Sequence, residues 1–268
     1  MTSFLGIDTS NYTTSIAFFD GTGGENCSKL LPVKSGELGL RQSDAVFAHI
    51  KSLPELSGRL FSHIGKSPIT AVGVSTRPRA VEGSYMPCFL AGVSAATAFA
   101  AARDIPLIHT THQQGHAAAA LYAAKGEALF SQKVLLFHIS GGTTDLLLCD
   151  QVRAITTLGT STDLYAGQAV DRVGVRLGFG FPAGVEVSRL AAQCTEEIRP
   201  KSSVKGLQCS LSGLENQCNA LLAAGKAPEY VCKYCLLCVA DTVVRMTKAA
   251  QKEYPGLPVV CAGGVMSS

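Results

Sequence analysis

The chain has 268 residues, of which 47% are hydrophobic and 16% are charged, and its net charge is +3. This composition excludes a disordered chain and is sufficient for two lobes with a substantial core. The small net charge neither favours nor excludes a nucleic-acid partner, and we interpret the basic stretch 199–205 as a solvated loop rather than a phosphate contact. Because the chain lacks an apolar run long enough for a bilayer and an N-terminal secretory signal, we expect a cytoplasmic protein without a membrane partner.

The first half of the sequence predicts alternating strands and helices. It begins with an apolar run, 4–7, that turns back into a second one, 16–19. Periodicity and breaker residues then predict three strands, 28–33, 69–74 (buried) and 106–110. They also predict three helices: 43–64, with a break near Pro54, then 86–103, which consists of small residues, and 112–125.

The second half repeats this order. We expect a hairpin of two strands, 134–139 and 146–149, and a final strand, 258–261, that enters a Gly-Gly turn. Between the hairpin and this strand we expect four helices, 167–177, 184–194, 213–224 and 230–252. The sequence contains no low-complexity linker between the halves. We place their boundary near 126–133, which gives an N-terminal lobe of residues 1–130 and a C-terminal lobe of residues 131–268.

The two hairpins share one kind of turn. Small and hydroxylated residues cluster in each turn with one acid, Asp8 in the first and Asp145 in the second. Gly141 and Gly142 let a ligand approach the backbone of the second turn, because they lack a Cβ. Hydroxyls and backbone N–H groups at such a bend can hold phosphate oxygens, and the carboxylate can position a cation or a water. One such turn is weak evidence, but two of them predict a duplicated fold with a phosphate site.

The order of these elements is typical of one α/β superfold, the two-lobed fold of actin, sugar kinases and heat-shock chaperones (ASKHA). In that fold two hairpins grip nucleotide phosphates, and a late strand followed by Gly-Gly approaches the adenosine. Residues 258–265 stand where this late element belongs. We therefore expect this duplicated fold, with a second lobe that is incomplete at its C-terminus. A sugar or acetate kinase would also be compatible, because the fold alone does not determine function.

Two histidines form a candidate metal site. His112 and His116 lie four residues apart at the start of a predicted helix, which places both imidazoles on one face within reach of one metal ion. The same spacing also occurs without a metal, and a catalytic metal usually needs a third protein ligand. His109 and His138 are not convincing third ligands, because both lie on predicted strands. The spacing alone leaves metal binding and an ordinary pair of helix histidines open.

The ten cysteines favour buried thiols over disulfides. The spacing Cys232-x-x-Cys235-x-x-Cys238 also occurs in iron–sulfur proteins. Here the three residues lie in a continuous helical pattern that would fan the sulfurs around the helix axis, and no fourth ligand is evident. We favour packed helix thiols over a cluster.

Several motifs together resemble one known family, the tRNA threonylcarbamoyladenosine transferases, formerly named O-sialoglycoprotein endopeptidases. The motifs are LGIDTSNYTTSIA, DIPLIHTTHQQGH, LLFHISGGTTDLLL, AGQAVDRVGVRLGFGFPAG, CSLSGLENQ and VVCAGGVMSS. They are collinear over essentially the whole chain. The combination of HxxxH with the Gly-Gln-Ala-Val-Asp-Arg segment is specific to this branch of the superfold.

The resemblance implies an acyltransferase of the N6-L-threonylcarbamoyladenine synthase type. Members of the family bind threonylcarbamoyl-adenylate and pass its threonylcarbamoyl group to the N6 amine of the tRNA adenosine beside the anticodon. The implied partners are tRNA, the adenylate or ATP, and other proteins of the tRNA-modification complex. The implied cofactor is one divalent metal ion, Fe²⁺ or Zn²⁺, held by His112, His116 and a later Asp.

The resemblance also assigns substrate-binding positions: the second loop (His138, Ile139, Ser140, Gly141 and Gly142), an acid for the ribose (Asp171) and a glycine beside the nucleoside (Gly184). A carboxylate can accept hydrogen bonds from both ribose hydroxyls, and a metal can polarise the carbonyl under attack. Because the mixed anhydride is already activated, we assign no catalytic nucleophile.

The chain departs from the family's pattern at three places. Tyr12 and Thr13 stand where the first loop carries acidic residues, and Thr143 stands where a His or Lys follows Ser-Gly-Gly. The sequence ends at Ser268, before the expected metal-binding Asp and C-terminal helix. We interpret this ending as truncation or divergence, and the loss of one metal ligand should weaken binding by about 10- to 100-fold or more.

The alternative to an enzyme is a catalytically inactive nucleotide-binding paralogue that acts as a partner or regulatory protein. The changed loop at Tyr12 and Thr13 favours this alternative, and the retained HxxxH opposes it. A metalloprotease lacks support, because the sequence has no HExxH and Gln113 and Gln114 cannot act as a general base.

Overall fold

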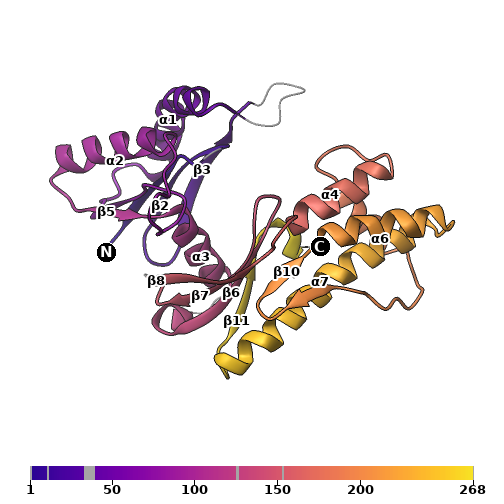
Figure 1. Ribbon diagram of the computed structural model, residues 1–268. Coiled ribbons are helices and arrows are strands. Elements are labelled where there is room, and N and C mark those ends of the chain that lie inside the picture. Colours follow the sequence, from indigo (N-terminus) through magenta and orange to yellow (C-terminus); the bar gives the residue numbers. More distant parts are fainter. Residues whose placement is uncertain (1, 11, 33–39, 125–126, 153, 268) are drawn as a thin grey trace. The chain divides into compact units, whose positions relative to one another are not determined.

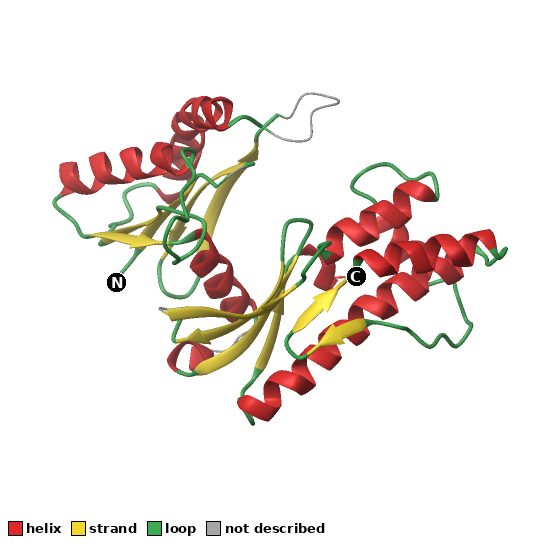
Figure 2. Cartoon of the chain, viewed as in Figure 1, coloured by secondary structure: helices red, strands yellow, loops and turns green. Residues whose placement is uncertain are grey.

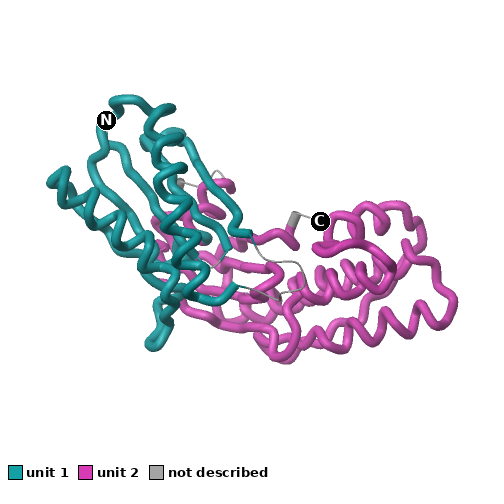
Figure 3. The backbone as a smooth tube through the Cα atoms, turned by 90° about the horizontal axis from the view of Figure 1, so that it is seen from above, with its two compact units in different colours: residues 1–116 teal, residues 117–268 magenta. Residues whose placement is uncertain are grey.

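The computed structural model describes residues 2–10, 12–32, 40–124, 127–152 and 154–267. The chain divides into two compact units, residues 1–116 and 117–268 (Figure 3). Each unit has its own β-sheet covered by helices, which is the α/β architecture that the sequence predicts (Figure 2). The expected lobes, 1–130 and 131–268, stay a prediction. Among the helices of the described ranges, none has the length and apolar character needed to span a bilayer.

Unit 1 contains a five-stranded mixed sheet in the order β3-β2-β1-β4-β5. Its strands are β1 (Phe4–Asp8), β2 (Thr13–Phe19), β3 (Gly24–Leu30), β4 (Ala71–Ser75) and β5 (Leu107–Thr110). The first three strands form an antiparallel meander, and β4 and β5 extend the sheet in parallel from β1. The predicted first hairpin is therefore the start of this sheet.

Two helices cover one face of the unit 1 sheet (Figure 1). The helix α1 (Gln42–Ile64) packs on β2 and β3, and α2 (Phe89–Arg103) packs on β4 and β1. Alternate strand residues such as Leu5, Ile7 and Ile16 fill the core beneath them. After β5 the chain enters a third helix, α3 (His112–Ala123).

Unit 2 contains a four-stranded sheet in the order β11-β6-β7-β8 and a separate ribbon of β9 and β10. The strands are β6 (Lys133–Ile139), β7 (Thr144–Asp150), β8 (Ala154–Thr160), β9 (Ser203–Lys205), β10 (Gln208–Ser210) and β11 (Val259–Ala262). β11 pairs in parallel with β6, whereas β6, β7 and β8 are antiparallel. Short 3₁₀ turns, Glu127–Ser131 and Gly264–Ser267, precede β6 and follow β11.

The central strand β6 is buried on both faces, which explains its continuous apolar run. Leu135 and Phe137 face the larger core, and Val134 and Leu136 face a smaller core that includes Leu121 of α3. The helices of the larger core are α4 (Ala166–Arg176), α5 (Gly184–Ala191), α6 (Ser212–Ala223) and α7 (Pro228–Glu253).

The structure corrects one prediction made from the sequence, the helix break in α1. The predicted break near Pro54 is wrong, because α1 continues through this residue. A proline inside a helix removes one hydrogen bond at a cost of about 3 kcal/mol. Leu53 and Leu56 on either side are buried under the helix, and this packing outweighs the cost. The predicted ends at Val33 and Lys125 lie outside the described residues.

The sequence does not predict β8, β9 and β10. The strands β9 and β10 have only three residues each, and the residues of β8, AITTLGT, show little alternation of apolar and polar side chains. All ten cysteines lie in the described ranges as free thiols, and only Cys261 is exposed. Cys232, Cys235 and Cys238 pack in the larger core of unit 2, as expected for helix thiols. Burial raises the pKa of Cys232 to about 11, so this thiol keeps its proton at neutral pH.

Candidate functional site

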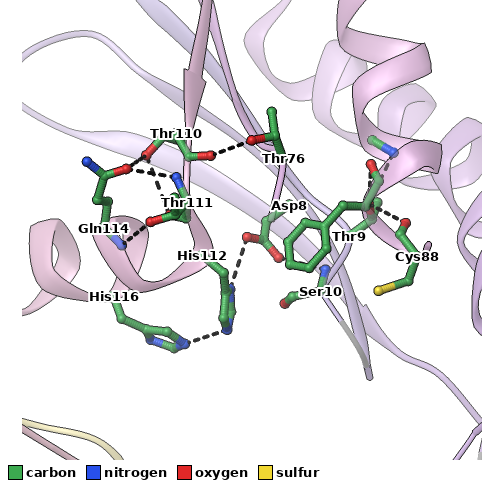
Figure 4. Close-up of polar contacts among 12 residues, drawn as sticks. Asp8, Thr9, Ser10, Thr76, Cys88, Thr110, Thr111, His112, Gln114 and His116 are labelled. Atoms are coloured by element: carbon green, nitrogen blue, oxygen red, sulfur yellow. Dashed lines mark hydrogen bonds and ion pairs between the residues drawn. The ribbon is translucent and has the colours of Figure 1, made fainter. Parts of the chain in front are cut away.

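The two candidate metal ligands lie in the first turns of α3 (Figure 4). Reciprocal hydrogen bonds fix the start of this helix: Thr111 N donates to Gln114 Oε1 at 2.9 Å, and Gln114 N donates to Thr111 Oγ1 at 3.2 Å. This is the capping-box pattern, which satisfies donors that a helix start leaves without partners. The backbone N–H of His112 donates to Arg77 O at 3.0 Å, so the loop after β4 also holds the first histidine in place.

The imidazoles of the pair converge. His116 Nε2 lies 2.9 Å from His112 Nε2, and His112 Nδ1 lies 3.1 Å from Asp8 Oδ2 at the end of β1. When Nδ1 of His112 carries the proton, it donates to the carboxylate and leaves Nε2 as a lone-pair donor. This carboxylate–histidine arrangement is the one that orients histidine metal ligands in proteins. Sequence reasoning did not assign Asp8 to the pair, because the two residues are 104 positions apart.

Asp8 is held in its ionised form. Burial raises its pKa, but hydrogen bonds from His112, Ser10 and Ser75 and the electrostatic attraction of the His112 ring outweigh burial and hold the pKa well below its usual range. The backbone N–H of Ser10 donates to Asp8 Oδ1 at 2.8 Å, which directs the other oxygen to His112. The site therefore offers two imidazole nitrogens backed by one fixed negative charge.

Unit 2 contains a cavity of about 380 Å³, a size within the range of small-molecule sites. Its lining combines the second turn, α4, the start of α5 and the turn after β11. The residues are Ser140, Gly141, Gly167, Val170, Asp171, Pro182, Gly184, Val185, Ser188, Gly264 and Val265. The walls are thus mainly backbone and small side chains, with Asp171 as the carboxylate.

The start of α4 is docked on the second turn. Gly167 N donates to Ser140 O at 3.1 Å, and Ala166 N donates to Thr144 Oγ1 at 2.8 Å. A Cβ on Gly167 would lie 2.6 Å from Gly141 N, so only glycine permits this approach. The N-terminus of α4 therefore borders the cavity, and helix N-termini favour negatively charged ligands.

Asp171 links α4 to the start of α5. Its Oδ1 accepts a hydrogen bond from Ala183 N at 2.8 Å, which leaves Oδ2 as an acceptor for a ligand hydroxyl. Gly174 allows the same two helices to pack closely, because a Cβ there would lie 2.3 Å from Ala183 Cβ. The position of the carboxylate at the cavity wall is thus set by helix packing.

The structure separates the predicted substrate-binding positions. Ser140, Gly141, Asp171 and Gly184 line the cavity. Of the others, Ile139 and His138 are 1% and 9% exposed at the end of β6, and Gly142 lies exposed in the turn. Their roles as ligand contacts stay predictions.

A third carboxylate, that of Asp163, organises the CSLSG segment, which includes the first two residues of α6. Desolvation raises the pKa of Asp163, but hydrogen bonds to its carboxylate outweigh desolvation and hold the pKa well below its usual range. Ser210 Oγ and Ser212 Oγ each donate to Oδ2 at 2.5 Å, and Leu211 N donates to Oδ1 at 2.8 Å. Sequence reasoning missed this role, because the serines lie more than forty positions further along the chain.

Comparisons with known sequences agree with the motifs. Residues 39–268 match the family model described as tRNA N6-adenosine threonylcarbamoyltransferase. Proteins of that name from Streptococcus equi subsp. zooepidemicus and Streptococcus gordonii are 36% and 33% identical over 211 and 214 residues, or 75% and 76% of this chain. The chain spans 60% and 61% of the length of these two relatives.

Comparisons with solved structures address the fold. HypF from T. kodakarensis superposes with a TM-score of 0.60 at 10% identity, over 98% of this chain and 42% of HypF. A glucokinase from Parabacteroides distasonis superposes with a TM-score of 0.53 at 12% identity, over 99% of this chain and 74% of the kinase. At such identities the likeness shows the fold alone, and it confirms the expected fold class of actin, sugar kinases and heat-shock chaperones.

Proposed function

The chain belongs to the tRNA N6-adenosine threonylcarbamoyltransferase family, and from this premise we propose that it transfers a threonylcarbamoyl group from threonylcarbamoyl-adenylate to the N6 amine of the tRNA adenosine beside the anticodon. The observation that carries the proposal is the family match over residues 39–268. The geometry of the histidine pair and of the unit 2 cavity supports it. A tRNA substrate would place the chain in the cytoplasm, and other proteins of the tRNA-modification complex would be its partners.

The start of α3 fits one divalent metal ion. His112 and His116 would hold it through Nε2 atoms that lie 2.9 Å apart, and Asp8 would fix His112 through Nδ1. Imidazole nitrogens are suitable ligands for both Zn²⁺ and Fe²⁺. When bound, the ion would polarise the carbonyl group that the amine attacks.

The cavity of unit 2 fits the nucleoside part of the adenylate. Asp171 Oδ2 would accept from a ribose hydroxyl, since Oδ1 is already bound to Ala183 N. Ser140 and Gly141, beside the N-terminus of α4, would contact the phosphate, with His138, Ile139 and Gly142 completing that loop. At Gly184 the absence of a side chain leaves the backbone open to the nucleoside.

The proposed transfer balances without a covalent enzyme intermediate. The amine nitrogen forms a bond to the carbonyl carbon, the bond from that carbon to the phosphate oxygen breaks, AMP leaves and the amine loses one proton. Because the anhydride is already activated, the residues around it orient the reactants and stabilise charge on oxygen.

The proposal is tested by tRNA-dependent release of AMP. Purified chain is incubated with Zn²⁺ or Fe²⁺, synthetic threonylcarbamoyl-adenylate and unmodified tRNA. We expect AMP release with the wild-type chain, a loss of about 100-fold or more in His112→Ala, and no change in His109→Ala, which removes an exposed histidine from β5.

A folded, metal-loaded chain that releases AMP no faster with tRNA than without it would contradict the transferase. If that same sample binds the adenylate or ATP, the result would identify a nucleotide-binding paralogue instead.

A further inference from the structure

Three metal-binding types of side chain meet where β3 lies beside the last turn of α1. Glu25 and Cys27 are two residues apart on β3, so both side chains point to the same face of the strand. His63 lies in the last turn of α1, the helix that packs on this strand. One carboxylate oxygen, one imidazole nitrogen and the sulfur of these residues all lie within 4.8 Å of one another.

The cluster has a solvent side and a buried side. His63 Nδ1 lies 3.1 Å from Glu25 Oε1, and these side chains are 57% and 45% exposed. Cys27 beneath them is 2% exposed and belongs to the core of unit 1. A metal ion could therefore enter through the exposed pair and reach a sulfur that the core shields from water.

The next position on the same strand face provides a contrast. Lys29 Nζ lies 2.6 Å from Glu55 Oε2 of α1, which is an ordinary surface ion pair. At Glu25 the partner on α1 is an imidazole, which offers a lone pair, and a thiol lies next to it. The second arrangement brings together three side chains that can each offer one ligand atom to a metal ion.

We propose that Glu25, Cys27 and His63 bind one Zn²⁺ ion, independently of the proposed transferase function. Thiolate, imidazole and carboxylate are the three ligand types of zinc sites, and bonds of about 2.0–2.3 Å place tetrahedral ligands about 3.3–3.5 Å apart. The three ligand atoms already lie within 4.8 Å of one another and would move closer on binding. Zn²⁺ would replace the thiol proton of Cys27 and the hydrogen bond between Glu25 and His63, and the displaced protons would pass to solvent. The ion would tie an edge strand to the end of its covering helix.

The test uses Co²⁺, because cobalt bound to a thiolate has a near-ultraviolet charge-transfer band. The parent protein is the chain with His112→Ala and His116→Ala, so that the histidine pair on α3 does not compete for the ion. We expect a saturable band at one equivalent of Co²⁺ that Zn²⁺ removes. Cys27→Ala should abolish the band, and Cys261→Ala, which removes the exposed cysteine, should leave it unchanged.

Glu25→Gln and His63→Gln provide the second arm. Each should weaken the apparent affinity for Co²⁺ by about 10-fold or more, since one ligand is lost. Both side chains are substantially exposed, so these variants fold even if the core substitution at Cys27 does not. The proposal is overturned if the folded parent gives no thiolate band, if Cys27→Ala keeps the band, or if both glutamine variants bind with the parent's affinity.

Discussion

Gly167→Ala tests how the cavity of unit 2 is built. Gly167 is the second residue of α4, and an added Cβ would lie 2.6 Å from Gly141 N, 2.7 Å from Gly141 Cα and 2.7 Å from Ser140 C. All three are backbone atoms that no side-chain rotation can move away. The methyl group must therefore displace either the start of α4 or the turn that lines the cavity.

The size of the expected change in the free energy of unfolding follows from a comparison with a matched control, Gly213→Ala. Gly213 is the second residue of α6, and within the described structure its Cβ would meet no atom within 4 Å. Alanine is favoured over glycine in a helix by up to about 1 kcal/mol, so Gly213→Ala should be neutral or stabilising. Overpacking costs about 1–3 kcal/mol, and three backbone overlaps place Gly167→Ala at the upper end. We expect a net loss of about 2 kcal/mol at Gly167, since the clash outweighs the helix preference.

Urea unfolding followed by circular dichroism measures this difference. A loss of about 2 kcal/mol lowers the urea midpoint by about 1 M when the m-value is near 2 kcal/mol/M. Binding of the adenylate should weaken in the same variant and not in Gly213→Ala. If Gly167→Ala is as stable as Gly213→Ala and binds the adenylate equally well, the close approach of α4 to the turn does not organise the cavity.

Three further substitutions test other parts of the structure. Asp8→Asn should weaken metal binding by the histidine pair by about 10- to 100-fold, measured by chelator competition, and an unchanged affinity would refute the supporting role of Asp8. Asp163→Asn should lower the unfolding free energy by about 1 kcal/mol at neutral pH. The pKa of Asp163 is lower in the folded protein than in the unfolded chain, where it is about 3.9, so the stabilisation by its carboxylate is complete above that pH and is lost as the pH falls through the native pKa. In unfolding measured as a function of pH, the stabilities of the wild type and Asp163→Asn should therefore converge below a pH of about 4. A stability difference that stays constant with pH would contradict this role of Asp163. Pro54→Ala should raise the stability by about 1–2 kcal/mol in thermal or urea unfolding, since it restores an N–H donor at an exposed helix position, and a lower stability would show that Pro54 serves the fold.

Patterns of apolar and polar residues along the chain predicted those features that depend only on residues close together in the sequence. The apolar run of β6 is buried on both faces, and the four-residue spacing of His112 and His116 brings their Nε2 atoms together. The pattern failed at Pro54, because burial of neighbouring leucines can outweigh a missing hydrogen bond, and this burial is not visible in local propensity.

Contacts between distant segments could not be read from the sequence. Asp8 meets His112 because β1 and the start of α3 are brought together by the unit 1 fold, and Asp163 meets Ser210 in a similar way in unit 2. Gly167 was visible only as part of a motif, and the structure shows which backbone atoms exclude a side chain there. The resemblance to the family was thus sufficient to predict residues that line the cavity, whereas the contacts that hold these residues in place are visible only in the structure.

Isotope transfer to tRNA tests the proposed function most directly. Threonylcarbamoyl-adenylate labelled with ¹³C at its carbonyl carbon is incubated with the metal-loaded chain and unmodified tRNA, and the digested nucleosides are measured by mass spectrometry. We expect labelled threonylcarbamoyladenosine with the wild-type chain and at least about 100-fold less with His112→Ala. Unlabelled tRNA from a folded, metal-loaded wild-type chain would contradict it.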